Sequence, residues 1–86
     1  MTELLNITPP QKKVLEAIAD YQKANGGFSP SYTEILEMTG LKGRGDISRY
    51  MHILNEKGYI KFSPVYARTA NVTKDGLDYL SKWPPA

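Results

Sequence analysis

Apolar residues recur at every third or fourth position in three stretches of the chain, which is the spacing of one face of an α-helix. The first helix is predicted to begin at a capping box of Thr8 and Gln11 and to end at residues 25–27, Asn-Gly-Gly. Its expected inward residues are Val14, Leu15, Ile18 and Tyr21. Residues 28–30 end in proline, so this segment is expected to be extended and is a candidate for a short edge strand.

Two shorter helices are predicted next, separated only by residues 41–43. A second capping box over 31–34 opens the earlier helix, and Gly40 ends it. Its expected inward residues are Ile35 and Met38, with the direction of Leu36 left open. The later helix runs from about residue 44 to 57 and turns inward Ile47, Tyr50, Met51 and Leu54. Because so few residues join these helices, they must pack at a steep angle, as in a helix-turn-helix motif.

A ribbon pattern follows the third helix. Alternation predicts a strand over 59–62, a loop over 63–67 and a returning strand over 68–72, before a final helix over 73–83. The expected fold is of the α+β class, mostly α: a winged helix-turn-helix with a three-helix core, a β-hairpin wing and a short C-terminal helix. We expect a single domain over 1–86, with its core in 8–72.

The distribution of charge says more than the net charge of +2. Residues 42–68 hold six basic and two acidic residues, a local net charge of +4, whereas the rest of the chain holds five basic and seven acidic residues. This polarity favours one face for a polyanion such as DNA. An ordinary solvated surface would give the same distribution, so charge alone does not choose between them.

Several classes of protein are not expected from the composition. The chain has no Cys and one His, so a disulfide is excluded, and neither a metal site, a cofactor nor a catalytic nucleophile–base pair is predicted. We therefore expect that it is not an enzyme. No apolar run approaches the ~18 residues of a membrane span, and the start lacks a signal-peptide pattern. A full-length small cytoplasmic protein is expected.

The third helix carries the candidates for reading DNA on the side away from its apolar residues. The major groove of B-form DNA, about 12 Å wide, admits one helix. On this side, Arg49 can pair bidentately with guanine and His52 can donate or accept a hydrogen bond. Asp46 and Ser48 lie on the flanks of this side and can reach bases or phosphates near the helix start, and Gly45 allows close backbone approach. An ordinary amphipathic surface helix would show the same distribution of apolar and polar residues on a helical wheel. The tight turn before the third helix and the ribbon after it favour DNA reading.

Basic residues around this helix are candidates for phosphate contacts. Lys42 and Arg44 flank the start of the third helix, whose free N–H groups already attract phosphate. In the wing, Lys61 and Arg68 are basic, and Tyr66 near the tip either bonds a phosphate or packs on the ribbon.

The last helix is the candidate surface for a homodimer, through Leu77, Tyr79, Leu80 and Trp83. Docking on the first helix should bury the leucines and leave the two aromatic residues for a second copy. The alternative is that this helix is only structural.

Four stretches carry a resemblance to a known family: TPPQKKVL at 8–15, FSPSYTEI at 28–35, GLKG at 40–43 and LNEKGYI at 54–60. Over about residues 7–72 the chain resembles the N-terminal DNA-binding domain of the LexA repressor family. The resemblance implies sequence-specific binding to double-stranded DNA and repressor-like regulation of transcription. It also implies base contacts from the first two turns of the third helix, at Gly43, Gly45, Asp46, Ser48 and Arg49.

The residue types at these positions differ from the family's usual ones, so the family's operator is not carried over. The chain ends before a self-cleaving peptidase domain could begin, so a cleavage switch is not expected either. Residues 72–80 are similar to the strand-to-helix join of MarR-like winged-helix regulators, whose terminal helices often dimerise. The remaining alternative is a winged helix that holds a protein partner without reading DNA. A steep fall of affinity with salt would distinguish DNA binding from that alternative.

Overall fold

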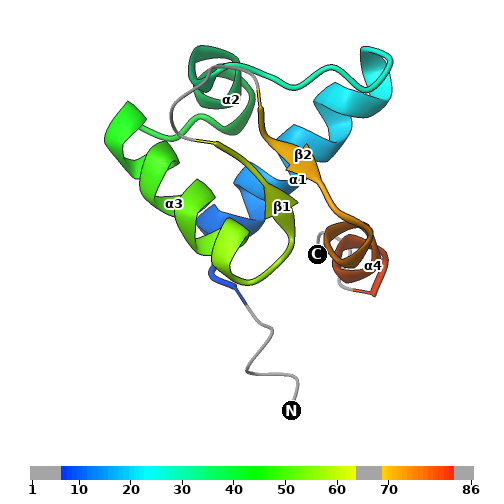
Figure 1. Ribbon diagram of the computed structural model, residues 1–86. Coiled ribbons are helices and arrows are strands. Elements are labelled where there is room, and N and C mark those ends of the chain that lie inside the picture. Colours follow the sequence, from blue (N-terminus) through cyan, green and yellow to red (C-terminus); the bar gives the residue numbers. More distant parts are fainter. Residues whose placement is uncertain (1–6, 64–68, 83–86) are drawn as a thin grey trace.

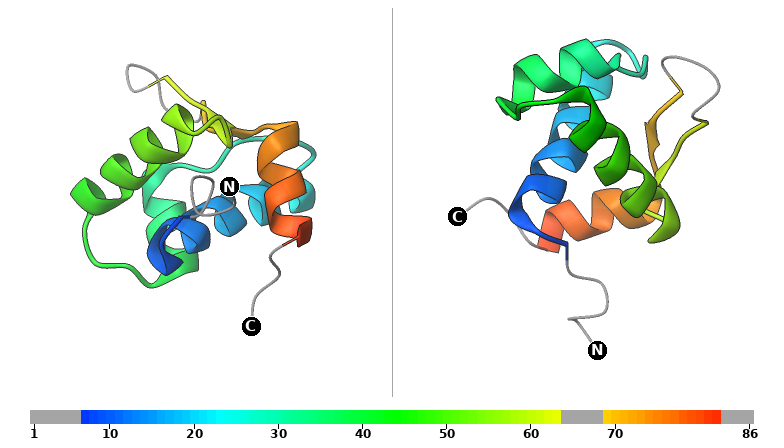
Figure 2. Two further views of the ribbon diagram at one scale, coloured as in Figure 1. Left: turned by 90° about the horizontal axis from the view of Figure 1, so that it is seen from below. Right: turned by 90° about the vertical axis from the view of Figure 1, so that its left-hand side faces the viewer.

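The computed structural model describes residues 7–63 and 69–82, and its helices and strands follow the predicted order (Figure 1). The elements are α1 (Pro9–Ala24), α2 (Tyr32–Thr39), α3 (Arg44–Glu56), β1 (Ile60–Lys61), β2 (Asn71–Val72) and α4 (Lys74–Lys82). α1 packs against α2, α3, β2 and α4, so it is the central helix of the domain (Figure 2). The winged helix-turn-helix fold predicted from the sequence is confirmed.

Local signals set the ends of the first two helices, as predicted. The Thr8 hydroxyl accepts from the backbone N–H of Gln11, and the Ser31 hydroxyl accepts from that of Glu34 at 3.2 Å. In both boxes the third residue returns a bond to the cap's own backbone N–H. Gly40 ends α2 in the left-handed region, at φ 71°, which glycine adopts without steric penalty.

The core is one cluster of apolar side chains drawn from every helix and from both sides of the hairpin. Its members are Val14, Leu15, Ile18, Ile35, Ile47, Met51, Leu54, Tyr59, Ile60, Ala70 and Tyr79. Burying each large side chain of this kind contributes roughly 1.5–3 kcal/mol to folding. All the predicted inward residues of α1 and α3 are in this cluster except Tyr21, which is half-buried, and Tyr50, which packs against it.

The inward face of α2 differs from the prediction. Met38 is 46% exposed, so its expected inward direction is wrong, whereas Leu36 packs against the core beside Ile35. Side chains at positions i and i+4 share one face of a helix, and Tyr32 and Leu36 are such a pair. The buried stripe of this short helix therefore passes through 32, 35 and 36 and leaves Met38 on its outer flank.

The hairpin is shorter than predicted. β1 and β2 pair antiparallel, with Ile60 opposite Val72 and Lys61 opposite Asn71. Farther along, the Thr69 hydroxyl accepts from the N–H of Ser63 and donates to its carbonyl, each at 2.9 Å. A side chain thus replaces the backbone ladder there, and residues 62–63 leave the strand. Residues 64–68, which include most of the predicted loop, lie outside the described part of the chain.

The candidate edge strand at 28–30 is not a strand. The Gln22 side chain occupies the outer edge of β2 instead: its Oε1 accepts from the N–H of Val72 at 2.9 Å. Its Nε2 donates to the Gly27 carbonyl at 2.9 Å and to the Asn71 side chain at 2.7 Å. Because this one amide joins α1, the following loop and β2, the backbone of 28–30 makes no ladder with β2.

The last helix docks through a different face from the one predicted. Tyr79 is 8% exposed and its ring stacks, tilted, 4.9 Å from that of Tyr59, whereas Leu77 is 54% exposed. The expectation is therefore wrong for Leu77, which stays exposed, and for Tyr79, which docks on the domain and is not left for a second copy. Leu80 is half-buried against the core. The docked face also contains Gly76, which is buried against the backbone of Tyr59.

Candidate nucleic-acid interface

The start of α3 presents bare backbone. Its N-cap is Gly43, in an extended conformation (φ −172°, ψ 141°), and no side chain caps the first turn. A Cβ atom built at Gly43 or at Gly45 would meet nothing within 4 Å. The free N–H groups and the positive end of the helix dipole are therefore open to an approaching anion. Lys42 is exposed immediately before them.

Asp46 and Arg49 form an ion pair on the outer face of α3. Arg49 Nη2 donates to Asp46 Oδ1 at 2.7 Å, and the two side chains are 66% and 48% exposed, respectively. Arg49 Cζ also lies 5.9 Å from the centre of the Tyr50 ring. An exposed pair of this kind contributes well under about 1 kcal/mol to folding. Arg49 was predicted on this face and Asp46 on its flank, but their pairing was not predicted, although a spacing of three residues on a helix is its signal.

The middle of α3 is joined to the base of the wing. His52 is exposed, and its ring meets that of Phe62 edge-on, with centres 5.2 Å apart and planes at 75°. Phe62 follows β1 directly, so this contact links α3 to the hairpin. Sequence reasoning placed His52 on this face and missed Phe62, whose only signal was its place at the end of the alternating stretch. Ser48 is half-buried on the flank of the helix.

The wing is described only in part. Lys61 on β1 is exposed, as a phosphate contact requires. Tyr66 and Arg68 lie outside the described residues, and so does Trp83 of the candidate dimer surface. Arg44 is the first residue of α3, beside Lys42. The structure thus brings Lys42, the bare glycines, Asp46 and Arg49 together at the start of one helix.

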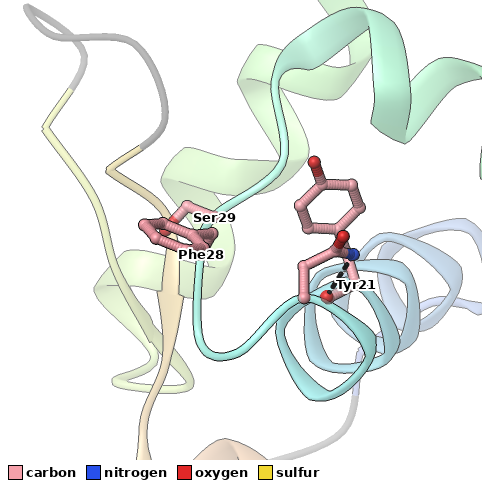
Figure 3. A pocket seen from close by; sticks show the side chains of 4 residues that line it. Tyr21, Phe28 and Ser29 are labelled. Carbon is pink, nitrogen blue, oxygen red and sulfur yellow. Dashed lines mark hydrogen bonds between the residues drawn. The ribbon is translucent and has the colours of Figure 1, made fainter.

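An open hollow lies on another part of the surface, at the end of α1 (Figure 3). It holds about 430 Å³ and is lined by Tyr21, Asn25, Phe28 and Ser29. The Asn25 amide is already committed to the Tyr21 carbonyl, at 2.8 Å, and Phe28 is 74% exposed. Among the described residues that line it there is no Asp, Glu, His, Lys or Arg, so these residues offer no charged acid–base pair.

Residues 7–63 and 69–82 show neither a membrane-spanning helix nor a cluster of metal-ligating side chains. In that part of the chain no helix has the length and apolar character needed to cross a bilayer. The same residues contain no group of three or more His, Asp or Glu side chains placed to hold a metal ion.

The chain is similar to known proteins over most of its length. The sequence model of the family described as the LexA DNA binding domain matches residues 4–69, which include α1, α2, α3 and β1. The LexA repressor of Bifidobacterium adolescentis is 38% identical over 66 residues, covering 77% of this chain and 25% of that protein. The LexA repressor of Frankia alni is 37% identical over 67 residues, covering 77% of this chain and 26% of its own. This chain therefore spans about a quarter of the length of these relatives.

Proposed function

Because the chain belongs to the LexA DNA-binding domain family, we propose that it binds double-stranded DNA by sequence and regulates transcription as a repressor-like cytoplasmic protein. In this proposal α3 enters the major groove with its first two turns against the base edges. The observation that carries it is the start of α3, where Gly43 and Gly45 leave the backbone bare and Arg49 stands exposed on the outer face.

Phosphate contacts surround this reading surface. Lys42 stands beside the uncapped N-terminus of α3, so a phosphate there meets both a cation and free N–H groups. We propose that Arg44 contacts the same phosphate as Lys42. Lys61, Tyr66 and Arg68 are proposed to contact the DNA phosphate backbone from the wing. Such contacts orient the protein on the duplex, while base preference comes from the outer face of α3.

The test is selection of bound fragments from a random pool of duplex DNA. Affinity for the selected site and for a scrambled site is then measured at several salt concentrations. We expect a clear preference for the selected site and a steep fall of affinity with salt, because phosphate contacts release counterions. Retention of no fragment would contradict the proposal and support the alternative, in which the same face holds a protein partner.

We also propose that two copies bind one operator through α4. The exposed Leu77 and the half-buried Leu80 border an open hollow of about 560 Å³ between α1 and α4, whose lining includes Ala19 and Val72. A two-fold pair would place two reading helices on half-sites about one helical turn apart. Tyr79 is left out of this surface because it is buried in the domain core.

Sedimentation tests the dimer. The variant Leu77→Glu/Trp83→Glu is compared with wild type, free and on the selected site. We expect wild type to pair on DNA and the variant to bind one half-site as a monomer. A wild-type protein that is monomeric at tens of micromolar, both free and on DNA, would contradict the dimer. It would not contradict the proposed role of α3.

A further inference from the structure

We propose that Asp46 is a positioning residue for base readout: it holds the Arg49 guanidinium toward a guanine edge and away from phosphate. This inference rests on the proposed function. It assigns a role in readout to a carboxylate whose charge, on a surface facing DNA, repels the phosphate backbone. The observation behind it is the ion pair itself, in which Asp46 and Arg49 meet on the outer face of α3.

The geometry restricts a flexible side chain. Asp46 and Arg49 are three residues apart, so both project from the same face of α3. The 2.7 Å bond from Nη2 to Oδ1 restrains one end of the guanidinium, and its Cζ lies 5.9 Å from the centre of the Tyr50 ring. Arginine loses rotamer freedom when it binds, and a side chain that is already held loses less at that moment.

The remaining donors match guanine. The arginine fork carries several N–H groups in one plane, and Asp46 accepts from only one of them. The others are free to pair with O6 and N7 of guanine, the usual bidentate contact of arginine in the major groove. Gly45 has no side chain, and a Cβ there would touch nothing, so no side-chain atom at this position stands between the pair and an approaching base.

The carboxylate also discriminates between the two targets of an arginine. A phosphate oxygen carries negative charge and is repelled by Asp46, whereas the guanine edge is neutral. The pair therefore favours base contact over backbone contact by Arg49. A carboxylate in the first turn also stabilises a helix through the helix dipole, and that role alone would not affect base preference.

Two substitutions separate positioning from charge. Asp46→Asn removes the charge but keeps an oxygen that can accept from Arg49, whereas Asp46→Ala removes both. Glu56→Ala, at the far end of α3, is the matched loss of one exposed negative charge. Affinity is measured for the selected site, for that site with the contacted guanine changed to adenine, and for scrambled DNA, with a melting curve for each variant.

We expect all three variants to bind scrambled DNA more tightly than wild type. Asp46→Ala should lose roughly tenfold of the preference for guanine over adenine, the scale of one bidentate contact, while Asp46→Asn and Glu56→Ala keep most of it. Unchanged preference in a folded Asp46→Ala would overturn this inference and leave the proposed function standing. Absence of any sequence preference in wild type would overturn both together.

Discussion

The backbone carbonyl of Tyr59 occupies the place where the first side-chain atom of residue 76 would stand, and Gly76 leaves that place free. A Cβ at this position would also lie 3.1 Å from Val72 Cγ1. The N–H of Gly76 donates to the Thr73 hydroxyl at 3.1 Å, and that hydroxyl donates in turn to the Gly58 carbonyl at 2.6 Å. The docking of α4 thus depends on close backbone contact at this glycine.

Gly76→Ala is expected to destabilise the domain by roughly 1–3 kcal/mol or more, because the new methyl group meets backbone atoms that cannot swing aside. The control is Gly45→Ala in α3, where a Cβ meets nothing within 4 Å and alanine should stabilise the helix by up to about 1 kcal/mol. Urea unfolding followed by circular dichroism measures both. Equal stability of the two variants would contradict the close contact at Gly76.

Gln22→Ala is expected to lower the free energy of unfolding by about 1–2 kcal/mol, because the N–H of Val72 loses its partner. Lys23→Ala is the control, since Lys23 is the exposed neighbour and such changes usually stay within about ±0.5 kcal/mol. Hydrogen exchange at the Val72 amide gives the local readout. Unchanged protection of this amide in Gln22→Ala would show that another group holds it.

Arg49→Ala should reduce the preference for the selected site by about 1–3 kcal/mol without unfolding the domain, because Arg49 is exposed and its ion pair adds little to stability. Affinities for selected and scrambled duplexes, with a melting curve, are the measurement. Lys57→Ala removes the same charge at the other end of α3 and should leave the preference unchanged. A full preference in Arg49→Ala would remove this residue from the readout.

Replacing Lys42 and Arg44 together with Ala should weaken binding to every sequence, because these residues are proposed to contact phosphate. The slope of log affinity against log salt should flatten by about 1–2 units. Lys13→Ala/Lys23→Ala on α1 removes the same charge away from α3 and should change the slope less. If the variant with Lys42 and Arg44 both replaced by Ala kept the salt slope of wild type but lost sequence preference, the assignment to phosphate contacts would be contradicted.

Tyr59 should make the domain sensitive to alkali. Burial raises the pKa of its phenol above the ordinary value of 10.0, and nearby Tyr79 and Asp75 raise it further. Below about pH 10 both states hold the proton; above it the unfolded chain releases the proton first, so stability falls as pH rises. Urea unfolding at about pH 8 and about pH 11 measures the loss, which Tyr59→Phe should reduce. An equal loss in wild type and Tyr59→Phe would assign it to other groups.

Sequence patterns predicted the helices well because helix ends depend on neighbours in the chain, as the boxes at Thr8 and Ser31 show. Inward faces were harder to predict. The direction of Met38 is set by which side of a two-turn helix meets α1 and α3, and no local pattern contains that information. Tyr79 was misplaced for a related reason: the docked face of α4 follows from the space at Gly76, which depends on a backbone atom seventeen residues earlier, in Tyr59.

The outer face of α3 was predictable because a helical wheel defines the outer face once the inward residues are known. The inward residues Ile47, Met51 and Leu54 are all fully buried. The partners on that face were not predicted. The contact of His52 with Phe62 joins residues that are neighbours only after the chain turns into β1. Tertiary packing, rather than local sequence, decides such contacts.

The amide of Gln22 has a consequence for how this small protein behaves when concentrated. A two-stranded ribbon exposes an edge that can recruit a strand from another molecule, which is a route to aggregation. At β2 the outward N–H of Val72 is already bonded to a side chain of the same molecule. Gln22 therefore occupies the open edge of β2 in place of a third strand, and we expect it to disfavour strand addition by another molecule.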